Sequence, residues 1–490
     1  MVDDKRLLRP GKTCWRVEDA DRFSVIIDAA DYFVAARRAM LEARHSILLL
    51  GWDFDPRIKF GEPEKGEPAT LGAFILWLAE RTPTLQIRLL RWDTGALKSL
   101  LCWRSLRTLA RWAMYPRITL RLDGKHPFSG SQHHKIVAID DQLAFCGGID
   151  MTVGRWDTRA HLDHDPQRKS PDGANLKPWH DATSMFDGKA ARAIGYLARD
   201  RWQTVTGQCL PPSPGNQLCW PEGFIPAFEA VRLGIARTIP KMENTAPCHE
   251  IEEAYLALIA RAQRFLYAES QYFASRKVAH AIAKRLVEED GPEIVIINPL
   301  SAEGWLEPVA MDTARARLVE ALQRLDRHGR FRLYHPVTKG GEPIYVHAKI
   351  TVVDHDILRV GSSNFNNRSL RLDTECDVIL STDEGDNAAL RPKIAALRND
   401  LLAEHLGVTP NTVADQLEQT GSLIKTIERL RTTGRTLTPY KVPPLFGIEE
   451  WLADNEILDP HGPDEIFEMP GRKSLFKGWT ALRRKRHRQG

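Results

Sequence analysis

The sequence HHKIVAID at residues 133–140 recurs as HAKITVVD at residues 347–354, and both copies follow the pattern H-x-K-x4-D. Their apolar, β-branched residues predict strands, on which side chains two residues apart point to the same face. Each copy therefore presents a histidine and a lysine side by side, His133 with Lys135 and His347 with Lys349. One such motif arises easily by chance, but two in equivalent contexts indicate one shared function.

The residues that follow each motif predict a hairpin. Turn-forming residues occupy 140–142 and 354–356, so each strand should fold back on itself. The return strands would bring Gly147-Gly148 and Gly361-Ser362 level with the histidines, where little side-chain bulk leaves room for a phosphate oxygen. We therefore predict phosphate contacts at a set of residues after the motifs: Gly147, Gly148, Asp150, Gly361 and Ser362.

The motif acids Asp140 and Asp354 lie an odd number of residues from their His/Lys pairs and should point to the opposite face. We interpret them as turn-stabilising residues that take no part in chemistry.

The two motifs end two similar series of expected elements. A helix at 31–41 precedes a strand at 47–54, and a helix at 251–259 precedes a strand at 265–273. This order predicts an α/β fold with a sheet in each half. We place the first half at 1–207, a linker at 208–226, the second half at 227–390, a helical C-terminal region at 391–470 and a basic tail at 471–490.

Composition indicates a globular protein of more than one domain. The 490 residues are 43% hydrophobic and 27% charged, with no apolar run long enough for a membrane span. The seven cysteines never form C-x-x-C, which is typical of a reducing compartment. The start of the chain lacks the apolar core of a signal peptide. We expect a cytoplasmic or peripheral membrane location, although export by another route stays open.

Two segments suggest contact with an anionic surface. The stretch Arg472–Gly490 contains eight Lys or Arg and no acid, which suits an anionic membrane, nucleic acid or mere solubility. The stretch Leu97–Tyr115 mixes aromatic and aliphatic residues with Lys and Arg. It fits a membrane interface or a core-facing helix with a basic outer side.

Several motifs together resemble the phospholipase D superfamily. The paired H-x-K-x4-D motifs, VGSSNFNNRS at 360–369 and ESQYF at 269–273 resemble its signatures, and PWHD at 178–181 is similar to its larger lipid-cleaving members. The first copy departs from the pattern, with Gly148 and Asp150 where Ser and Asn are usual. The resemblance implies two pseudo-symmetric α-β-α sandwich halves that pack face to face, with one active site at their junction.

Phosphodiester cleavage without a metal needs a nucleophile, an acid and fixed positive charge. The resemblance implies His133 as nucleophile, through a phosphohistidine, and His347 as general acid and base. Lys135, Lys349 and Asn364 would stabilise the transition state. Asp181 and Glu375, by position in the repeat, are the expected carboxylate partners of the imidazoles.

No metal or cofactor is expected. A cluster in a polar segment, His161, Asp163, His164 and Asp165, fits a solvated loop better than a metal site. The stretch 404–410 faintly resembles a helix-turn-helix, but a packing helix pair is the preferred interpretation.

The favoured function is phospholipid head-group hydrolysis with transphosphatidylation, by a monomer. A cardiolipin synthase-like phosphatidyltransferase and a nuclease remain alternatives, and nucleic acid is not excluded as a partner.

Overall fold

The computed structural model describes residues 6–93, 103–214, 220–243, 245–302, 311–384 and 389–443. The predicted tail at 471–490 lies outside these residues, as does part of Leu97–Tyr115. Within the described residues, no helix is both long and apolar enough to cross a membrane. Cys14, Cys146, Cys209, Cys248 and Cys376 are free thiols.

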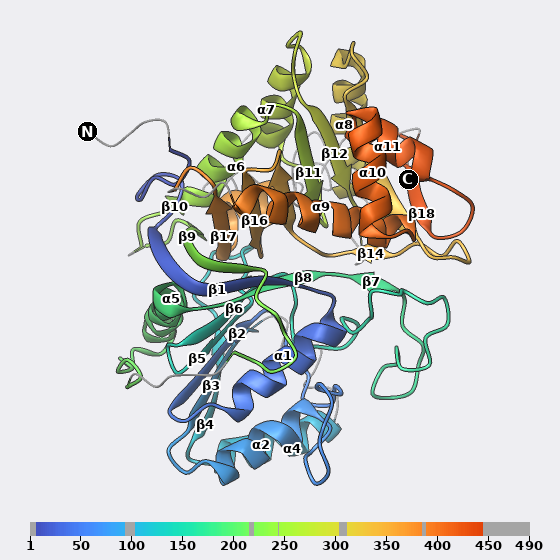
Figure 1. Cartoon of the computed structure of the whole chain (residues 1–490). Coiled ribbons are helices and arrows are strands. Elements are labelled where there is room, and N and C mark those ends of the chain that lie inside the picture. The colour runs from blue at the N-terminus through green and yellow to red at the C-terminus, as the bar shows by residue number, and fades with distance from the viewer. Residues whose placement is uncertain are drawn as a thin grey trace, which may run out of the picture.

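The first half alternates strands and helices (Figure 1). Its elements are β1 (Arg16–Ile27), α1 (Ala29–Leu41), β2 (Ser46–Gly51), α2 (Leu71–Arg81), β3 (Gln86–Trp92), α4 (Trp103–Met114), β4 (Ile118–Asp123), β5 (Ile136–Ile139), β6 (Leu143–Gly147), β7 (Trp179–His180), β8 (Ala182–Asp187) and α5 (Gly188–Thr206).

The second half repeats this order. Its elements are β9 (Phe228–Ile239), β10 (Cys248–His249), α6 (Glu250–Arg261), β11 (Phe265–Glu269), α7 (Arg276–Leu286), β12 (Glu293–Ile297), α8 (Thr313–Leu325), β13 (Phe331–Val337), β14 (Tyr345–Val346), β15 (Ile350–Val353), β16 (Ile357–Gly361), the π-helical turn η2 (Arg368–Leu372), β17 (Glu375–Ser381) and α9 (Leu390–Leu406), followed by α10 (Pro410–Thr420), α11 (Leu423–Leu430) and β18 (Thr436–Pro439).

One sheet runs through both halves. Its order is β18-β13-β12-β11-β15-β16-β17-β9-β1-β8-β6-β5-β2-β3-β4. The strand order of the second half mirrors that of the first, and the halves meet at β9 and β1. These two long strands pair antiparallel, with Ala20 opposite Val231. The hydrogen-bonded junction brings β6 and β8 of the first half against β16 and β17 of the second.

Each half is a three-layer sandwich, which confirms the predicted fold class. In the first half, α1 and α2 share a core with one face of the sheet, and α5 packs on the other face. In the second half, α6, α7 and α8 cover one face, and α9 to α11 cover the other. One hydrophobic cluster contains residues from both halves, including Ala144, Cys146, Val360 and Val378. The halves therefore share a core rather than a thin interface.

The C-terminal region is not only a helical extension. Helix α9 follows β17 as α5 follows β8, and both helices end at a left-handed glycine, Gly407 and Gly207. Strand β18 then pairs antiparallel with β13 at the edge of the sheet. The structure thus assigns α9 to the second sandwich, and α9 and α10 form the expected packing pair.

The described part of Leu97–Tyr115 faces the core on one side. In α4, Trp112 is buried and its indole N–H donates to the carbonyl of Gly72, while Arg107 and Arg111 are exposed.

Candidate active site

Each motif lies at the start of a central hairpin. His133 and Lys135 precede β5, and His347 and Lys349 precede β15. The hairpins form as predicted, because the amide of Gly147 donates to the carbonyl of Lys135 at 3.3 Å and that of Gly361 to Lys349 at 3.2 Å. The two motifs therefore have the same backbone setting.

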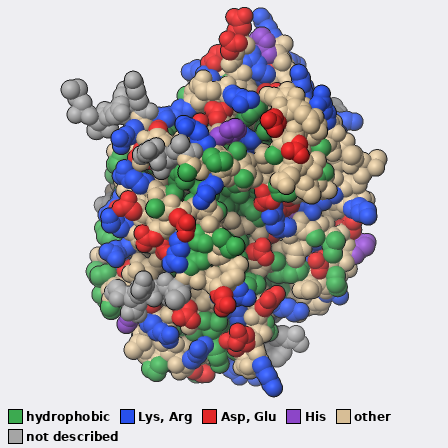
Figure 2. Space-filling view, viewed as in Figure 1, with side chains coloured by type: hydrophobic (Ala, Val, Ile, Leu, Met, Phe, Trp, Pro, Cys, Tyr) green, Lys and Arg blue, Asp and Glu red, His purple; other side chains and the backbone are tan. Residues whose placement is uncertain are grey.

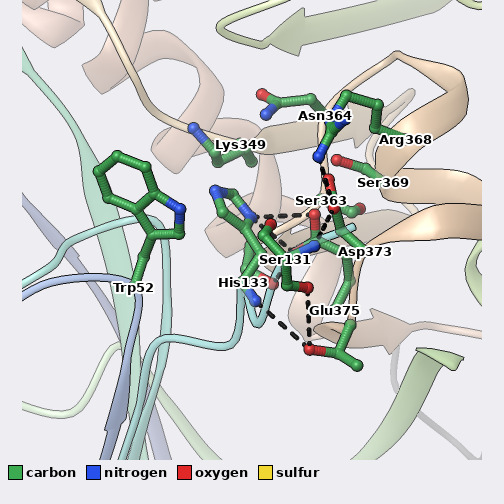
Figure 3. Close-up of polar contacts among 12 residues, drawn as sticks. Trp52, Ser131, His133, Lys349, Ser363, Asn364, Arg368, Ser369, Asp373 and Glu375 are labelled. Carbon is green, nitrogen blue, oxygen red and sulfur yellow. Dashed lines mark hydrogen bonds and ion pairs between the residues drawn. The ribbon is translucent and has the colours of Figure 1, made fainter. Parts of the chain in front are cut away.

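The two halves exchange their carboxylates. Nδ1 of His133 lies 2.9 Å from both carboxylate oxygens of Glu375, which begins β17 of the second half (Figure 3). Nδ1 of His347 lies 2.6 Å from Asp181 Oδ2, which belongs to the first half. Since Nδ1 is engaged in both rings, Nε2 is the nitrogen available to a substrate in each.

Backbone hydrogen bonds repeat the same exchange. The amide of His133 donates to the carbonyl of Thr374 at 3.1 Å, and the amide of His347 donates to His180 at 2.7 Å. Just before His133, the amide of Ser131 donates to Asp373 Oδ1 at 2.7 Å. Each histidine is thus fixed to the residue that precedes its carboxylate partner, so neither half-site is complete without the other half.

Both imidazoles are held neutral. Burial, followed by the ammonium of Lys135, lowers the pKa of His133 well below its usual range. Burial, followed by Lys349, does the same to the pKa of His347, and Lys135 also contributes. The lysines of both motifs therefore act on both rings, which places the four side chains in one electrostatic environment.

The carboxyl partners respond in the opposite direction. Burial, followed by the nearby Asp373, raises the pKa of Glu375 well above its usual range. Burial also raises the pKa of Asp181, against the opposing charge of Lys349. Ser362 orients Glu375, since its hydroxyl donates to Oε2.

The two lysines differ in their counterions. Lys135 Nζ forms a buried ion pair with Asp150 Oδ2 at 3.1 Å. At the equivalent position the second half has Asn364, and Lys349 Nζ instead lies 3.4 Å from Gln271 Oε1. Burial lowers the pKa of Lys349 to about 7, against the opposing effect of Asp181. The second half-site therefore offers the cation that an anionic substrate would neutralise.

The predicted phosphate contacts after the first motif stay a prediction, and the structure shows a packing role for the same residues. A Cβ on Gly148 would lie 2.2 Å from Asp181 Oδ1, and one on Gly147 2.3 Å from the backbone of Thr183. The amide of Gly148 already donates to Ala182. These glycines leave room for the neighbouring strand β8 and for Asp181, the residue that precedes it. Asp150 is likewise the counterion of Lys135, and its negative charge would repel a phosphate.

The equivalent residues of the second half, Gly361 and Ser362, are also packed closely against a neighbouring strand. A Cβ on Gly361 would lie 2.0 Å from Asp377 Oδ1, and the amide of Gly361 is used within the hairpin. The amide of Ser362 donates to Cys376, and its hydroxyl holds Glu375. Close strand packing therefore accounts for the small residues in both copies.

Asn364 keeps a place at the site. Its Oδ1 accepts a hydrogen bond from the amide of Gln271 at 3.2 Å, which leaves Nδ2 as the donor atom of the side chain. Figure 3 shows Asn364 on the same side as Lys349, with the indole of Trp52 from the first half directed toward this group.

The motif acids lie in turns and bind backbone. Asp140 accepts hydrogen bonds from the amides of residues 44–46, and Asp354 accepts them from residues 263–265. Both acids have positive φ values, 50° and 52°. Each therefore ties its hairpin turn to the start of the adjacent antiparallel strand, β2 for β5 and β11 for β15.

The prediction of a solvated loop is wrong for His161. Its side chain is buried, with Nδ1 2.9 Å from Asp157 and Nε2 3.1 Å from Glu404. Asp163 binds the amide of Gly340 instead, and His164 is exposed. A polar sequence favours an exposed loop, but buried ion pairs can hold such a segment inside the fold.

The sequence analysis did not identify the stacked aromatic side chains beside His347. Trp179 stacks on Tyr345 with ring centroids 4.5 Å apart and lies 5.2 Å from the His347 ring. Arg155 lies over the opposite side of Trp179 at 4.2 Å. Trp179 belongs to the PWHD segment at 178–181, so this segment contained the residue that could have indicated the aromatic contact.

Comparisons with known proteins agree with this fold. A sequence profile described as "Cardiolipin synthase, PLD-like domain" matches residues 255–391, which include the second motif. Phospholipase D alpha 1 of Nicotiana tabacum is 24% identical over 76% of this chain and 63% of its own length. Phospholipase D1 of Saccharomyces cerevisiae is 24% identical over 78% of this chain and 28% of its own length.

A solved structure shares the fold across both halves. The crystal structure of phosphatidylserine synthase from Haemophilus influenzae is 14% identical, has a TM-score of 0.56, and covers 85% of this chain and 97% of its own. Residues 255–391 thus match a PLD-like domain, and the larger part of the chain is similar in sequence to phospholipases D. The chain spans less than two thirds of the length of the phospholipases D named above.

Proposed function

We propose that the protein is a phospholipase D-type enzyme that hydrolyses the head-group phosphodiester of a phospholipid to phosphatidate. The observation that carries this proposal is the exchange of carboxylates between the halves, which joins two neutral imidazoles and two lysines at one junction. Such a set supplies a nucleophile, a proton donor and fixed positive charge from side chains alone.

In the first step, Nε2 of His133 attacks phosphorus and forms the P–N bond. The P–O bond to the head group breaks, and His347 protonates the leaving alkoxide. Glu375 holds the His133 tautomer through Nδ1, and Asp181 does the same for His347. Because a bound phosphodiester is anionic, it offsets the lysine charges and raises the pKa of His347, so the ring can carry the proton it donates.

In the second step, His347 removes a proton from water, and the resulting nucleophile attacks the phosphohistidine. The P–N bond breaks, phosphatidate leaves and His133 returns to its neutral form. A primary alcohol in place of water would give a phosphatidyl alcohol by the same path. This second reaction is the expected transphosphatidylation. If alcohols compete strongly with water, the protein would act mainly as a phosphatidyltransferase.

Lys349 and Asn364 are the proposed phosphate contacts of the second half-site. Lys349 has no carboxylate at the position equivalent to Asp150, and Asn364 Nδ2 is a neutral donor. Losing one such donor typically costs about 3–4 kcal/mol of transition-state stabilisation.

A lipid substrate is favoured by two observations. The relatives in the comparison above are named phospholipase D. Phe128, five residues before His133, is 88% exposed, and an exposed aromatic side chain this near the site in the sequence suits contact with a bilayer interface. The face in Figure 2 mixes Lys and Arg with Asp and Glu among its coloured side chains, rather than presenting one broad basic stripe for nucleic acid.

Product analysis tests the proposal. The full chain is incubated with phosphatidylcholine vesicles, phosphatidylglycerol vesicles and single-stranded DNA, each with and without ethanol. We expect phosphatidate from vesicles, phosphatidylethanol when ethanol is present, and intact DNA. Cleavage of DNA with unchanged lipid would contradict the proposal and support the nuclease alternative.

Membrane contact is tested by Phe128→Ser, with Ile225→Ser as the matched control because Ile225 is 89% exposed. We expect lower activity on vesicles for Phe128→Ser alone and unchanged turnover of a soluble short-chain substrate for both. Equal loss in both variants would contradict a specific role for Phe128.

A further inference from the structure

Four buried side chains converge directly behind the His347–Asp181 pair. They are Asp28 after β1, His161 in the loop before β7, His180 in β7 and Glu404 in α9. Their side chains are at most 1% exposed. None of the four takes part in the proposed chemistry.

The distances between their donor atoms fit one small cation. Nε2 of His161 lies 3.1 Å from Glu404 Oε1 and 3.4 Å from Asp28 Oδ2. Nδ1 of His180 lies 2.9 Å from Glu404 Oε1 and 3.3 Å from Asp28 Oδ1. A tetrahedral zinc ion with bonds of about 2.0–2.1 Å places its ligand atoms about 3.3 Å apart.

The outer nitrogen of each imidazole is already held by a carboxylate. Nδ1 of His161 lies 2.9 Å from Asp157 Oδ2, and Nε2 of His180 lies 2.8 Å from Glu269 Oε2. Arg168 in turn holds Asp157 at 3.0 Å. A carboxylate on the far nitrogen of a histidine is the usual support of a metal-binding imidazole, because it fixes the ring and the tautomer.

Two atoms of the cluster are in ion-pair contact but make no well-aligned hydrogen bond. These are Asp28 Oδ2 and His180 Nδ1, both fully buried. His180 Nδ1 is close to Glu404 Oε1 but does not aim a hydrogen bond at it. A buried polar atom without a hydrogen bond is costly, and a shared cation would satisfy both. Asp28 and His161 also have positive φ values, 65° and 41°.

We propose that Asp28, His161, His180 and Glu404 bind one divalent transition-metal ion of the zinc class. Two neutral imidazoles and two carboxylates carry a charge of −2, which one such ion neutralises. Imidazole and carboxylate ligands in a four-coordinate arrangement suit zinc. With all four ligands from the protein, the ion is structural and enters no step of the reaction.

The ion would position the acid–base pair and helix α9. The amide of Asp181 donates to Asp28 Oδ1 at 3.0 Å, and the amide of Asp28 donates to the carbonyl of Asp181 at 2.8 Å. The carbonyl of His180 accepts the His347 amide. Because Glu404 belongs to α9, the ion would also tie the second half to the first.

Metal content provides the first test. The full chain is unfolded with a chelator, refolded with or without Zn²⁺, passed through a desalting column and analysed by mass spectrometry for metals. We expect about one zinc per chain after refolding with Zn²⁺, together with a higher melting temperature. Less than a tenth of an equivalent in a correctly folded chain would overturn the proposal.

Variants then locate the ion. His161→Gln and Glu404→Gln should each lower zinc affinity by at least 100-fold, whereas the matched control His164→Gln, an exposed histidine of the same loop, should bind as the wild type does. Asp157→Asn, which removes only the support of His161, should weaken binding by about 10–100-fold.

If a ligand variant fails to fold, the cobalt-substituted wild type decides. A tetrahedral Co²⁺ absorption spectrum with nitrogen and oxygen ligands supports the proposal. A nitrogen NMR spectrum that shows both imidazoles doubly protonated in the presence of excess Zn²⁺ contradicts it. These readouts do not depend on turnover, so they are separate from the test of the proposed function.

Discussion

The two half-sites have almost the same backbone and different charges. In both, a hairpin carries the histidine and lysine, and the other half supplies the carboxylate. In the first, Asp150 neutralises Lys135, whereas in the second the equivalent residue is Asn364 and Lys349 lacks that counterion. A repeated motif can therefore keep its geometry while only one copy retains a carboxylate beside its lysine.

The largest expected effect comes from removing either imidazole. His133→Ala and His347→Ala should each reduce kcat by roughly 10⁵–10⁶-fold, because both rings act on one bond. The double variant should be little worse than either single variant, since residues that act as a unit are non-additive. Turnover is measured with circular dichroism as a control for folding. Near-normal turnover in one single variant would show that the halves work separately.

The exchanged carboxylates should be almost equally important. Glu375→Gln and Asp181→Asn keep the shape of the side chain but can leave the imidazole in the wrong tautomer. We expect each to lower kcat by about 10²–10⁴-fold with little change in KM. A large effect for one and none for the other would limit the exchange to a single half-site. The measurement is steady-state kinetics on a soluble substrate.

Exchanging the counterion residues tests the charge difference itself. Asn364→Asp gives the second half-site a carboxylate, and we expect kcat/KM to fall by about 10²-fold because an anion replaces a donor. Asp150→Asn leaves the shape of the first half-site intact and should change kcat/KM by about tenfold or less. If Asp150→Asn were the more damaging variant, the substrate phosphate would depend mainly on the first half-site.

The pH dependence of kcat/KM should depend on Lys349. This side chain has a pKa of about 7, lowered by burial, so it loses its charge as the pH rises through that value. We therefore expect kcat/KM to decline above about pH 7. A bound phosphate favours the charged form, so kcat should decline only at higher pH. In Asn364→Asp the decline of kcat/KM should move upward, and a flat profile to pH 9 would contradict this role.

The smallest expected effect concerns the tail, which lies outside the described residues. Truncation after Pro470 should weaken binding to phosphatidylglycerol vesicles at low salt, since each basic residue near such a surface contributes about 1 kcal/mol. Turnover of a soluble substrate should be nearly unchanged. Co-sedimentation at two ionic strengths measures the binding. Equal sedimentation would remove the tail from the membrane proposal.

The sequence predicts the local geometry of the site well. Spacing of two residues on a strand places His133 with Lys135 and His347 with Lys349, and the turns at Asp140 and Asp354 produce the hairpins. These features depend only on strand periodicity and turn chemistry, which act over a few residues. The repeat likewise indicates two sandwich halves, and the structure confirms that fold class.

The sequence does not show which distant residues pair with each other in the site. Glu375 lies 242 residues from His133 and Asp181 lies 166 residues before His347, so which carboxylate serves which ring follows only from the junction of the sheets. The small residue Gly148 indicates close approach, but not that Asp181 fills the space. In the sequence alone, His161 and Glu404 look like surface residues. The fold buries both of them where four segments of the chain meet.

Trapping the covalent intermediate tests the central claim most directly. His347→Ala is mixed with a phosphodiester that has a labelled phosphate and a good leaving group, quenched in acid-free denaturant and digested for peptide mass spectrometry. Without the residue that activates water, the intermediate should accumulate with the label on His133. In the reciprocal His133→Ala variant, no histidine should carry label. Label on His347 in that variant, with none on His133 in the first, would reverse the roles of the two half-sites.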